Sequence, residues 1–154
     1  MVFSVFSAGL IVREIKGQIY YKEGVVARNA QNWPEAIFRY RKAMEIDPAN
    51  LQAAYKLCFV YANVNQTEDA INLYRQILRI SPNFAKTYYN LALLSLRLND
   101  KNLAVAYLNL GLHYDPYDTE VQKILNILTN PATKTSVNPR PNGQVSQNQP
   151  IPRR

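Results

Sequence analysis

The hydrophobic and polar positions of this chain repeat with a period of 34 residues. Three consecutive blocks, residues 17–50, 51–84 and 85–118, align without a gap. A small residue stands at the twentieth position of each block, a large one at the twenty-fourth and a proline at the thirty-second. In block order these residues are Ala36, Ala70 and Ala104, then Tyr40, Tyr74 and Leu108, then Pro48, Pro82 and Pro116. A period of this length indicates stacked copies of one structural unit.

Each block has the pattern of two helices joined by a turn. The small residue lets the second helix approach the first closely, and the large residue lies one turn later on the same face. The proline follows the second helix, where its missing N–H and fixed φ prevent the helix from continuing. Polar pairs separate the two helices of each block: Gln31 and Asn32, Asn65 and Gln66, Asn99 and Asp100.

These blocks resemble the tetratricopeptide repeat, a helix–turn–helix unit of the same length. The small residue at the family's eighth position is here Gly24, Cys58 and Ala92. The aromatic residue at its eleventh position is present only in the second block, as Tyr61, and is replaced by Ala27 and Ser95 in the others. The resemblance covers residues 17–118 and implies an all-α, right-handed solenoid of three repeats.

The segment before the repeats, residues 1–16, is expected to form a leading helix. It is apolar from Met1 to Val12, and Arg13 then ends the apolar run. We expect Val12, Ile15 and Ile19 to pack onto the first repeat. A membrane anchor or a signal peptide is the less favoured alternative, because no basic residue precedes the run and a span needs ~20 apolar residues.

The segment after the repeats divides into a helix and a tail. Residues 119–129 are expected to form a helix that begins at the N-cap Thr119 and covers the last repeat. Its apolar side consists of Val121, Ile124, Leu125 and Leu128. Residues 130–154 are rich in Pro, Asn, Gln and Ser, so they cannot offset their ordering entropy by burial, and we expect them to be disordered.

The formal net charge of +7 comes largely from that tail. Lys134, Arg140, Arg153 and Arg154 contribute +4 without any acid, which leaves 14 of the 18 basic residues against all 11 acidic ones elsewhere. The rest of the chain is therefore only mildly basic, which specifies neither nucleic acid nor membrane as a partner. Nucleic-acid binding through stacked tyrosines, and a peripheral membrane scaffold using the leading segment or the tail, are the less favoured functions.

Residues for catalysis are sparse. The single cysteine, Cys58, stands at a small packed position, and the single histidine, His113, lies near a helix end where it interacts favourably with the last carbonyls. One cysteine excludes an internal disulfide and, with one histidine, argues against a structural zinc site. We expect no enzyme activity, no cofactor and no metal, in a cytoplasmic protein.

The resemblance also implies a concave groove lined by the first helices of the repeats. The fifth position of each block, which faces it, is a tyrosine in all three. The predicted groove consists of Tyr21, Lys22, Val25, Arg28, Gln52, Tyr55, Lys56, Phe59, Asn63, Lys86, Tyr89, Asn90, Leu93 and Arg97. Since none of these residues is acidic, we expect the groove to bind a partner protein through a peptide with acidic groups and apolar anchors. The alternative is that the tyrosines merely pack between adjacent helices.

One branch of the family binds the C-terminal carboxylate of heat-shock chaperones with lysines and asparagines at fixed positions. The corresponding residues here are Tyr21, Val25, Lys56, Lys86 and Asn90, of which only Lys86 matches. We therefore do not predict chaperone-tail binding. The expected role is that of an adaptor or assembly factor for another partner.

Overall fold

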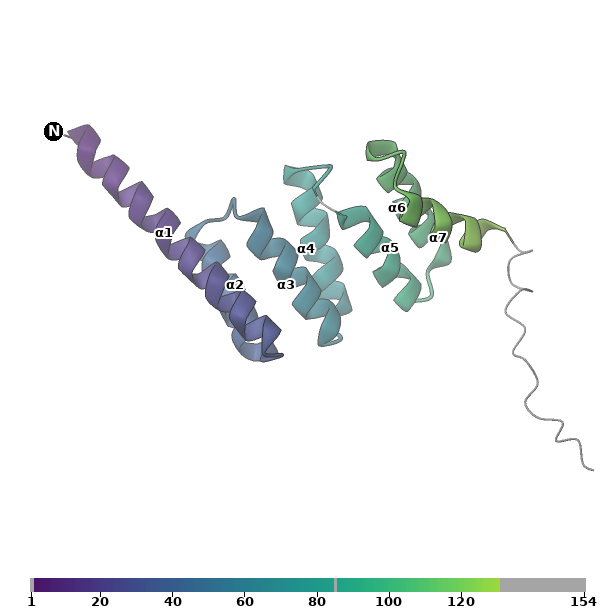
Figure 1. The fold of residues 1–154 in the computed structure, drawn as a ribbon, viewed down its shortest axis with the longest axis horizontal. Coiled ribbons are helices and arrows are strands. Elements are labelled where there is room, and N and C mark those ends of the chain that lie inside the picture. Colours follow the sequence, from purple (N-terminus) through teal and green to yellow (C-terminus); the bar gives the residue numbers. More distant parts are fainter. Residues whose placement is uncertain (1, 85, 131–154) are drawn as a thin grey trace, which may run out of the picture.

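The computed structural model describes the backbone of residues 2–84 and 86–130 and the side chains from Val12 onward, and within these residues every regular element is a helix. The helices stack in chain order along the long axis of the molecule (Figure 1). They are α1 (Val2–Asn29), α2 (Trp33–Ile46), α3 (Leu51–Asn63), α4 (Thr67–Ile80), α5 (Thr87–Arg97), α6 (Lys101–Tyr114) and α7 (Thr119–Thr129). The predicted all-α repeat fold is confirmed.

The turn between the two helices of a block has the same backbone shape in each repeat. Gln31, Asn65 and Asn99, each 34 residues after the last, have φ angles of 56°, 62° and 61°. This left-handed conformation suits asparagine better than most residues. In the first and third blocks the side chains of Asn32 and Asp100 then cap α2 and α6 by accepting from the backbone N–H of Glu35 and Leu103.

The small and large residues that carry the repeat are the centre of the core. Ala36, Ala70 and Ala104 are completely buried, so the second helix of each block lies close to its neighbours. Tyr40, Tyr74 and Leu108 are also buried, as their position one turn later predicts. The core has two parts: one extends from α1 to α5, and a smaller one joins α5, α6 and α7.

Helix α7 covers the last repeat as expected. Val121 is buried against Ala104 and Leu108, and Ile124, Leu125 and Leu128 pack around it. Its N-cap, however, is Asp118 and not Thr119, because the Asp118 carboxylate accepts hydrogen bonds from the backbone N–H groups of Glu120 and Val121 at 3.1 and 3.2 Å.

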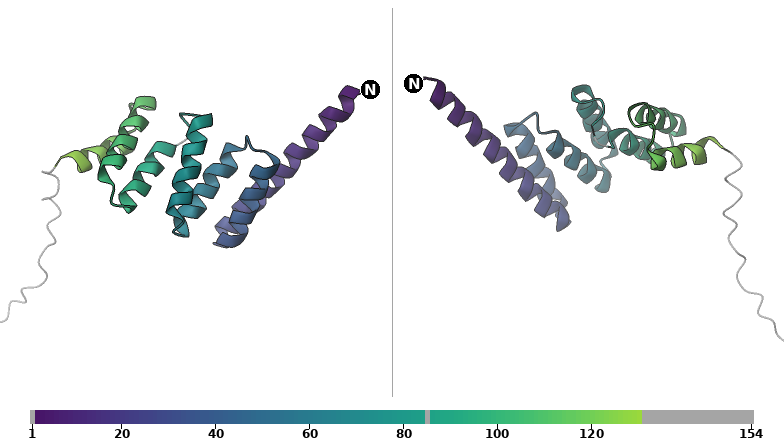
Figure 2. Two further views of the ribbon diagram at one scale, coloured as in Figure 1. Left: turned by 180° about the vertical axis from the view of Figure 1, so that it is seen from behind. Right: turned by 45° about the horizontal axis from the view of Figure 1, so that its top comes forward.

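The leading segment is not a separate helix packed onto the first repeat. It is continuous with the first helix of that repeat in α1, since no proline or cap interrupts the chain before Asn29. Gly17 lies opposite the end of α2, near Ile46 and Asp47, and the residues before it project beyond α2 (Figures 1 and 2). Val12, Ile15 and Ile19 are about half exposed, so they do not pack onto the first repeat as predicted.

Of the tail predicted to be disordered, residues 130–154, only Asn130 is among the described residues, where it follows α7; residues 131–154 lie outside them.

Candidate peptide-binding groove

The three tyrosines of the predicted groove lie on α1, α3 and α5, the first helices of successive repeats. Tyr21 contacts Tyr40 of α2 with ring centroids 6.1 Å apart, and Tyr55 contacts Tyr74 of α4 at 5.7 Å. All three tyrosines are only half-buried. Each of these rings therefore supports the packing of helices while one side of it stays accessible.

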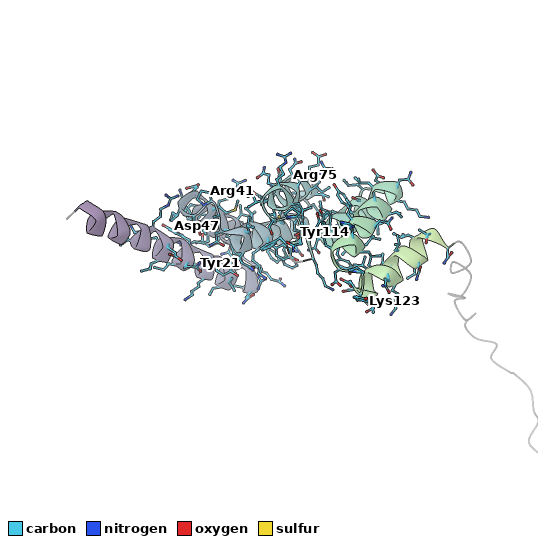
Figure 3. All side chains as sticks on the ribbon, turned by 90° about the horizontal axis from the view of Figure 1, so that it is seen from above. Tyr21, Arg41, Asp47, Arg75, Tyr114 and Lys123 are labelled. Atoms are coloured by element: carbon cyan, nitrogen blue, oxygen red, sulfur yellow. The ribbon has the colours of Figure 1, made fainter. Side chains whose placement is uncertain are left out.

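Figure 3, a view from above, shows the two sides of the solenoid. Tyr21 and Lys123, on α1 and α7, lie along one long side, and Arg41 and Arg75, on α2 and α4, lie along the other. Arg41 and Arg75 donate to the hydroxyls of Tyr61 and Tyr107 at 2.9 and 3.1 Å. These two arginines thus serve to join neighbouring repeats.

Polar groove residues also join one repeat to the next. The Asn90 side-chain amide donates to the Tyr55 hydroxyl at 2.8 Å, and the Arg97 guanidinium donates to the backbone carbonyl of Ala62. Asn63 donates to the carbonyl of Phe59 in its own helix at 2.7 Å. Asn90, Arg97 and Asn63 were predicted to face a ligand, and each of them forms one of its hydrogen bonds within the protein.

The basic residues that the predicted groove takes from the first two repeats keep their charge uncompensated. Among the described residues, Lys22, Arg28 and Lys56 form no ion pair with an acidic side chain, whereas Lys86 does. Lys56 lies over the ring of Tyr55, with 5.9 Å from Nζ to the centroid, and Arg28 lies over the ring of Phe59 at the same distance. Cation–π contacts of this kind orient a cation without neutralising it.

Apolar surface accompanies these cations. Phe59 is 47% exposed and Leu93 is 39% exposed, although both are large hydrophobic residues on first helices. Val25 is half-buried and packs against the core, and Gln52 is exposed at the start of α3. The predicted groove therefore carries exposed apolar side chains beside positive charge.

The third repeat differs, because an acidic side chain from α7 occupies it. Lys86 Nζ lies 2.5 Å from one Glu120 oxygen and 3.8 Å from Asp118, and the Tyr89 hydroxyl donates to the other Glu120 oxygen at 3.0 Å. Hydrogen bonds from Lys86 and Tyr89 lower the pKa of Glu120, so the contact is present at neutral pH and is lost as the pH falls through that lowered pKa. None of the predicted groove residues is acidic, but Glu120, which was not predicted to be in the groove, brings an acid to it.

Glu120 was not predicted as a groove residue because the repeats were counted only as far as Asp118. One further period from Lys86 leads to residue 120, and α7 lies where the first helix of a fourth repeat would lie. The signal that could have found it is the second position of each block. That position is Gln18, Gln52 and Lys86 in the three repeats, and Glu120 continues the series.

Residues 64–128, which reach from the end of α3 into α7, match the sequence profile of the tetratricopeptide repeat family. This part of the chain belongs to the tetratricopeptide repeat family. Among curated proteins no relative matches the sequence of the chain.

Solved structures share the fold of this tetratricopeptide protein at low sequence identity. The N-terminal domain of stress-induced protein-1 from C. elegans is 20% identical with a TM-score of 0.70, over 77% of this chain and 98% of that one. The first tetratricopeptide domain of Spaghetti (RPAP3), bound to the HSP90 peptide SRMEEVD, is 18% identical with a TM-score of 0.67, over 75% and 94%. MamA is 22% identical with a TM-score of 0.66, over 73% of this chain but only 62% of its own.

The other residues considered for chemistry are Cys58 and His113, of which the first is in the core and the second at the surface. Cys58 is completely buried, and burial raises the pKa of its thiol. His113 is exposed at the end of α6 with its ring edge-on to Tyr114. Among the described residues no three His, Cys, Asp or Glu side chains gather where they could hold a metal ion. None of the described helices combines the length and hydrophobicity needed to cross a membrane.

Proposed function

We propose that this tetratricopeptide protein is an adaptor or assembly factor that binds an acidic, amphipathic peptide segment of a partner protein. The peptide lies along α1, α3 and α5. Its carboxylates meet Lys22, Arg28 and Lys56, and its apolar side chains contact Phe59 and Leu93.

The observation that carries this proposal is the contact between Glu120 and the third repeat. A carboxylate there accepts hydrogen bonds from a lysine and from the tyrosine at the fifth position of the block. The first and second repeats have Gln18 and Gln52 at the position of Lys86, but each keeps the tyrosine and has a lysine directly after it, Lys22 after Tyr21 and Lys56 after Tyr55. A carboxylate of a partner can therefore meet a tyrosine and a lysine in each of the first two repeats, with the lysine at a different position of the helix from Lys86.

The uncompensated charges favour a ligand position on the first two repeats. Charge-assisted hydrogen bonds to a carboxylate are stronger than neutral ones, so an uncompensated lysine attracts acid more than one already paired. Lys86 is paired with Glu120, whereas Lys22, Arg28 and Lys56 are not. A partner that also reached the third repeat would have to displace Glu120.

The peptide SRMEEVD bound by the Spaghetti domain is acidic, which agrees with the charge of the ligand proposed here. The residues that would hold a chaperone tail differ in this chain, because tyrosine and valine replace the lysine and asparagine of the first repeat at Tyr21 and Val25. Lys86 is the single match, and Glu120 already engages it. The proposed partner therefore has internal acidic residues, and a terminal chaperone carboxylate is not the proposed ligand.

The proposal is tested by reversing the charge of the free lysines. The double variant Lys22→Glu with Lys56→Glu is expected to lose the partners that the wild-type protein captures from its native lysate. Its matched control is Arg79→Glu with Lys101→Glu, which makes the same change of charge at exposed sites on α4 and α6. Circular dichroism establishes that both variants keep their helices.

Two results would contradict the proposal. One is a groove variant that retains every wild-type partner, and the other is a control variant that loses the same partners. In the expected case, capture by the wild-type protein also weakens as salt concentration rises, because surface charges are screened.

A further inference from the structure

Helix α1 exposes a stripe of aliphatic side chains on the side that faces no other helix. Val12, Ile15, Ile19 and Val26 are 52%, 54%, 49% and 69% exposed. Val12, Ile19 and Val26 are seven residues apart, and Ile15 lies between the first two. This is the spacing at which aliphatic residues form the seam between two paired helices. We call these four residues the α1 stripe.

The α1 stripe lies opposite the face of α1 that packs within the chain. Gly17 and Gly24 face α2, where a side chain at Gly24 would collide with Tyr40. With 100° of rotation per residue, Ile15 and Ile19 lie about 160° from Gly17, and Val26 lies at the same angle from Gly24. A helix that is apolar on two opposite faces is typical of one buried between two neighbours. Helix α2 supplies one of these neighbours.

A hollow continues the stripe at its C-terminal end. It has a volume of about 500 Å³ and is lined by Val26, Ala27 and Ala30 from α1 and the following turn, and by Glu35 and Arg39 from α2. Lys22 and Glu23 form its near edge. At the other end of the stripe, the residues of α1 before Arg13 project beyond α2 and include no charged residue. The molecule thus offers an apolar projection and an apolar hollow at opposite ends of one stripe.

We propose that the α1 stripe is a dimerisation surface that binds the α1 stripe of a second copy of this chain in antiparallel orientation. With Ile19 near the two-fold axis, Val12 of each copy lies close to Val26 of the other. The uncharged start of each α1 then extends over the hollow of the other copy. A symmetric pair of this kind uses the same surface twice, which is the commonest arrangement of oligomers.

The charges beside the stripe select the antiparallel orientation. Lys16 and Glu23 lie on the same edge of the stripe, and in an antiparallel pair that edge meets its own copy, so each Lys16 faces a Glu23. Glu23 remains partly exposed while it pairs with Arg39 at 2.8 Å, so it can accept a second cation. Lys22 lies at the seam in either orientation, but a parallel pair would bring the two Lys22 side chains directly together, where like charges repel.

The first test is the mass of the full chain in solution, measured by light scattering during size-exclusion chromatography over a series of protein concentrations. The wild-type protein is expected to be a dimer that dissociates on dilution. Ile19→Glu is expected to lose the dimer without loss of helicity, because Ile19 is half exposed in the monomer. Ile127→Glu is the matched control, since Ile127 is 53% exposed on α7, and it is expected to keep the dimer.

The second test addresses orientation. Lys16→Glu and Glu23→Lys each place two pairs of like charges across an antiparallel seam, so each variant alone is expected to dimerise more weakly. An equimolar mixture of the two variants restores two pairs of opposite charge and is expected to recover the dimer. Recovery is not expected from a parallel pair, in which Lys16 and Glu23 do not meet.

The proposal is overturned if the wild-type chain stays monomeric at every concentration, or if Ile19→Glu and Ile127→Glu dimerise equally. It is also overturned if the mixture of charge variants fails to recover the dimer. Vesicles of phosphatidylcholine and phosphatidylglycerol provide the remaining test. A monomeric wild-type chain that sediments with them, while Ile19→Glu does not, would identify lipid and not a second copy as the occupant of the stripe.

Discussion

Two glycines of α1 face α2, and they differ in how closely α2 approaches them. A Cβ atom at Gly24 would lie 2.7 Å from two ring atoms of Tyr40, whereas at Gly17 its nearest neighbour would be the Cβ of Asp47 at 3.4 Å. Tyr40 is completely buried, so its ring has no room to withdraw. Gly24→Ala should therefore overpack this contact and lower the free energy of unfolding by about 1–3 kcal/mol.

Gly17→Ala is the matched variant in the same helix. An added methyl group meets only ordinary contacts there, so the variant should gain most of the ~1 kcal/mol by which helices favour alanine over glycine. Urea unfolding of the two variants and the wild type measures both effects. Equal stability of the two variants would mean that α1 and α2 are not as close at Gly24 as the structure has them.

At the residue scale the sequence predicts which side chains are buried better than it predicts their hydrogen-bond partners. The 34-residue period correctly predicts that Ala36 and Tyr40 are buried, because only a small and a large residue one turn apart allow two helices to pack closely. It does not predict that the Tyr40 hydroxyl has no hydrogen-bond partner among the described residues. Burial raises the pKa of that hydroxyl to about 12. Whether a buried hydroxyl finds a hydrogen-bond partner depends on which atoms of neighbouring side chains lie close to it. A repeat pattern does not contain that information.

At the scale of helices, the repeats were predictable and their ends were not. Each repeat has a proline and a polar turn that stop its helices, so the pairs from α1 to α6 follow from the sequence. Nothing between Val2 and Asn29 stops a helix, and therefore counting back from the repeat placed a boundary at Gly17 that does not exist. At the other end, counting stopped before Glu120, although α7 continues the stack by one more helix.

Helix α7 acts on the groove through Glu120, and this leads to a prediction for binding. The Glu120 carboxylate takes the place at Lys86 and Tyr89 that an acidic group of a ligand would take. Glu120→Gln removes that charge and leaves Lys86 uncompensated except for the more distant Asp118. The variant should therefore bind the acidic partners of the wild-type protein more tightly, by a few-fold, in a titration followed by fluorescence anisotropy.

The control for Glu120→Gln is Glu68→Gln, which removes one exposed acid from the start of α4. Both variants raise the net charge equally, so a general electrostatic effect would strengthen binding equally in the two. A stronger effect for Glu120→Gln shows that the contact competes with the ligand. Weaker binding by Glu120→Gln would mean that Glu120 instead holds Lys86 and Tyr89 in their binding positions.

At the scale of the whole molecule, the core is divided along the chain. Tyr40, Leu57 and Tyr74 belong to the part that extends from α1 to α5, and Leu108 belongs to the part shared by α5, α6 and α7. In a solenoid each unit contacts only its neighbours, so stability is approximately a sum of local contributions. Damage at one end should therefore remain largely at that end.

Leu108→Ala tests this division, because Leu108 is completely buried at the centre of the smaller part. The variant should lose about 2–5 kcal/mol of local stability through the cavity it creates. Hydrogen exchange followed by mass spectrometry should then show faster exchange in α6 and α7, with smaller changes in α5 and unchanged protection in α1 and α2. Leu57→Ala, in the larger part, should accelerate exchange in α3 and its neighbours α2 and α4. If either variant accelerates exchange equally in all seven helices, the two parts of the core unfold together and the molecule behaves as one cooperative unit.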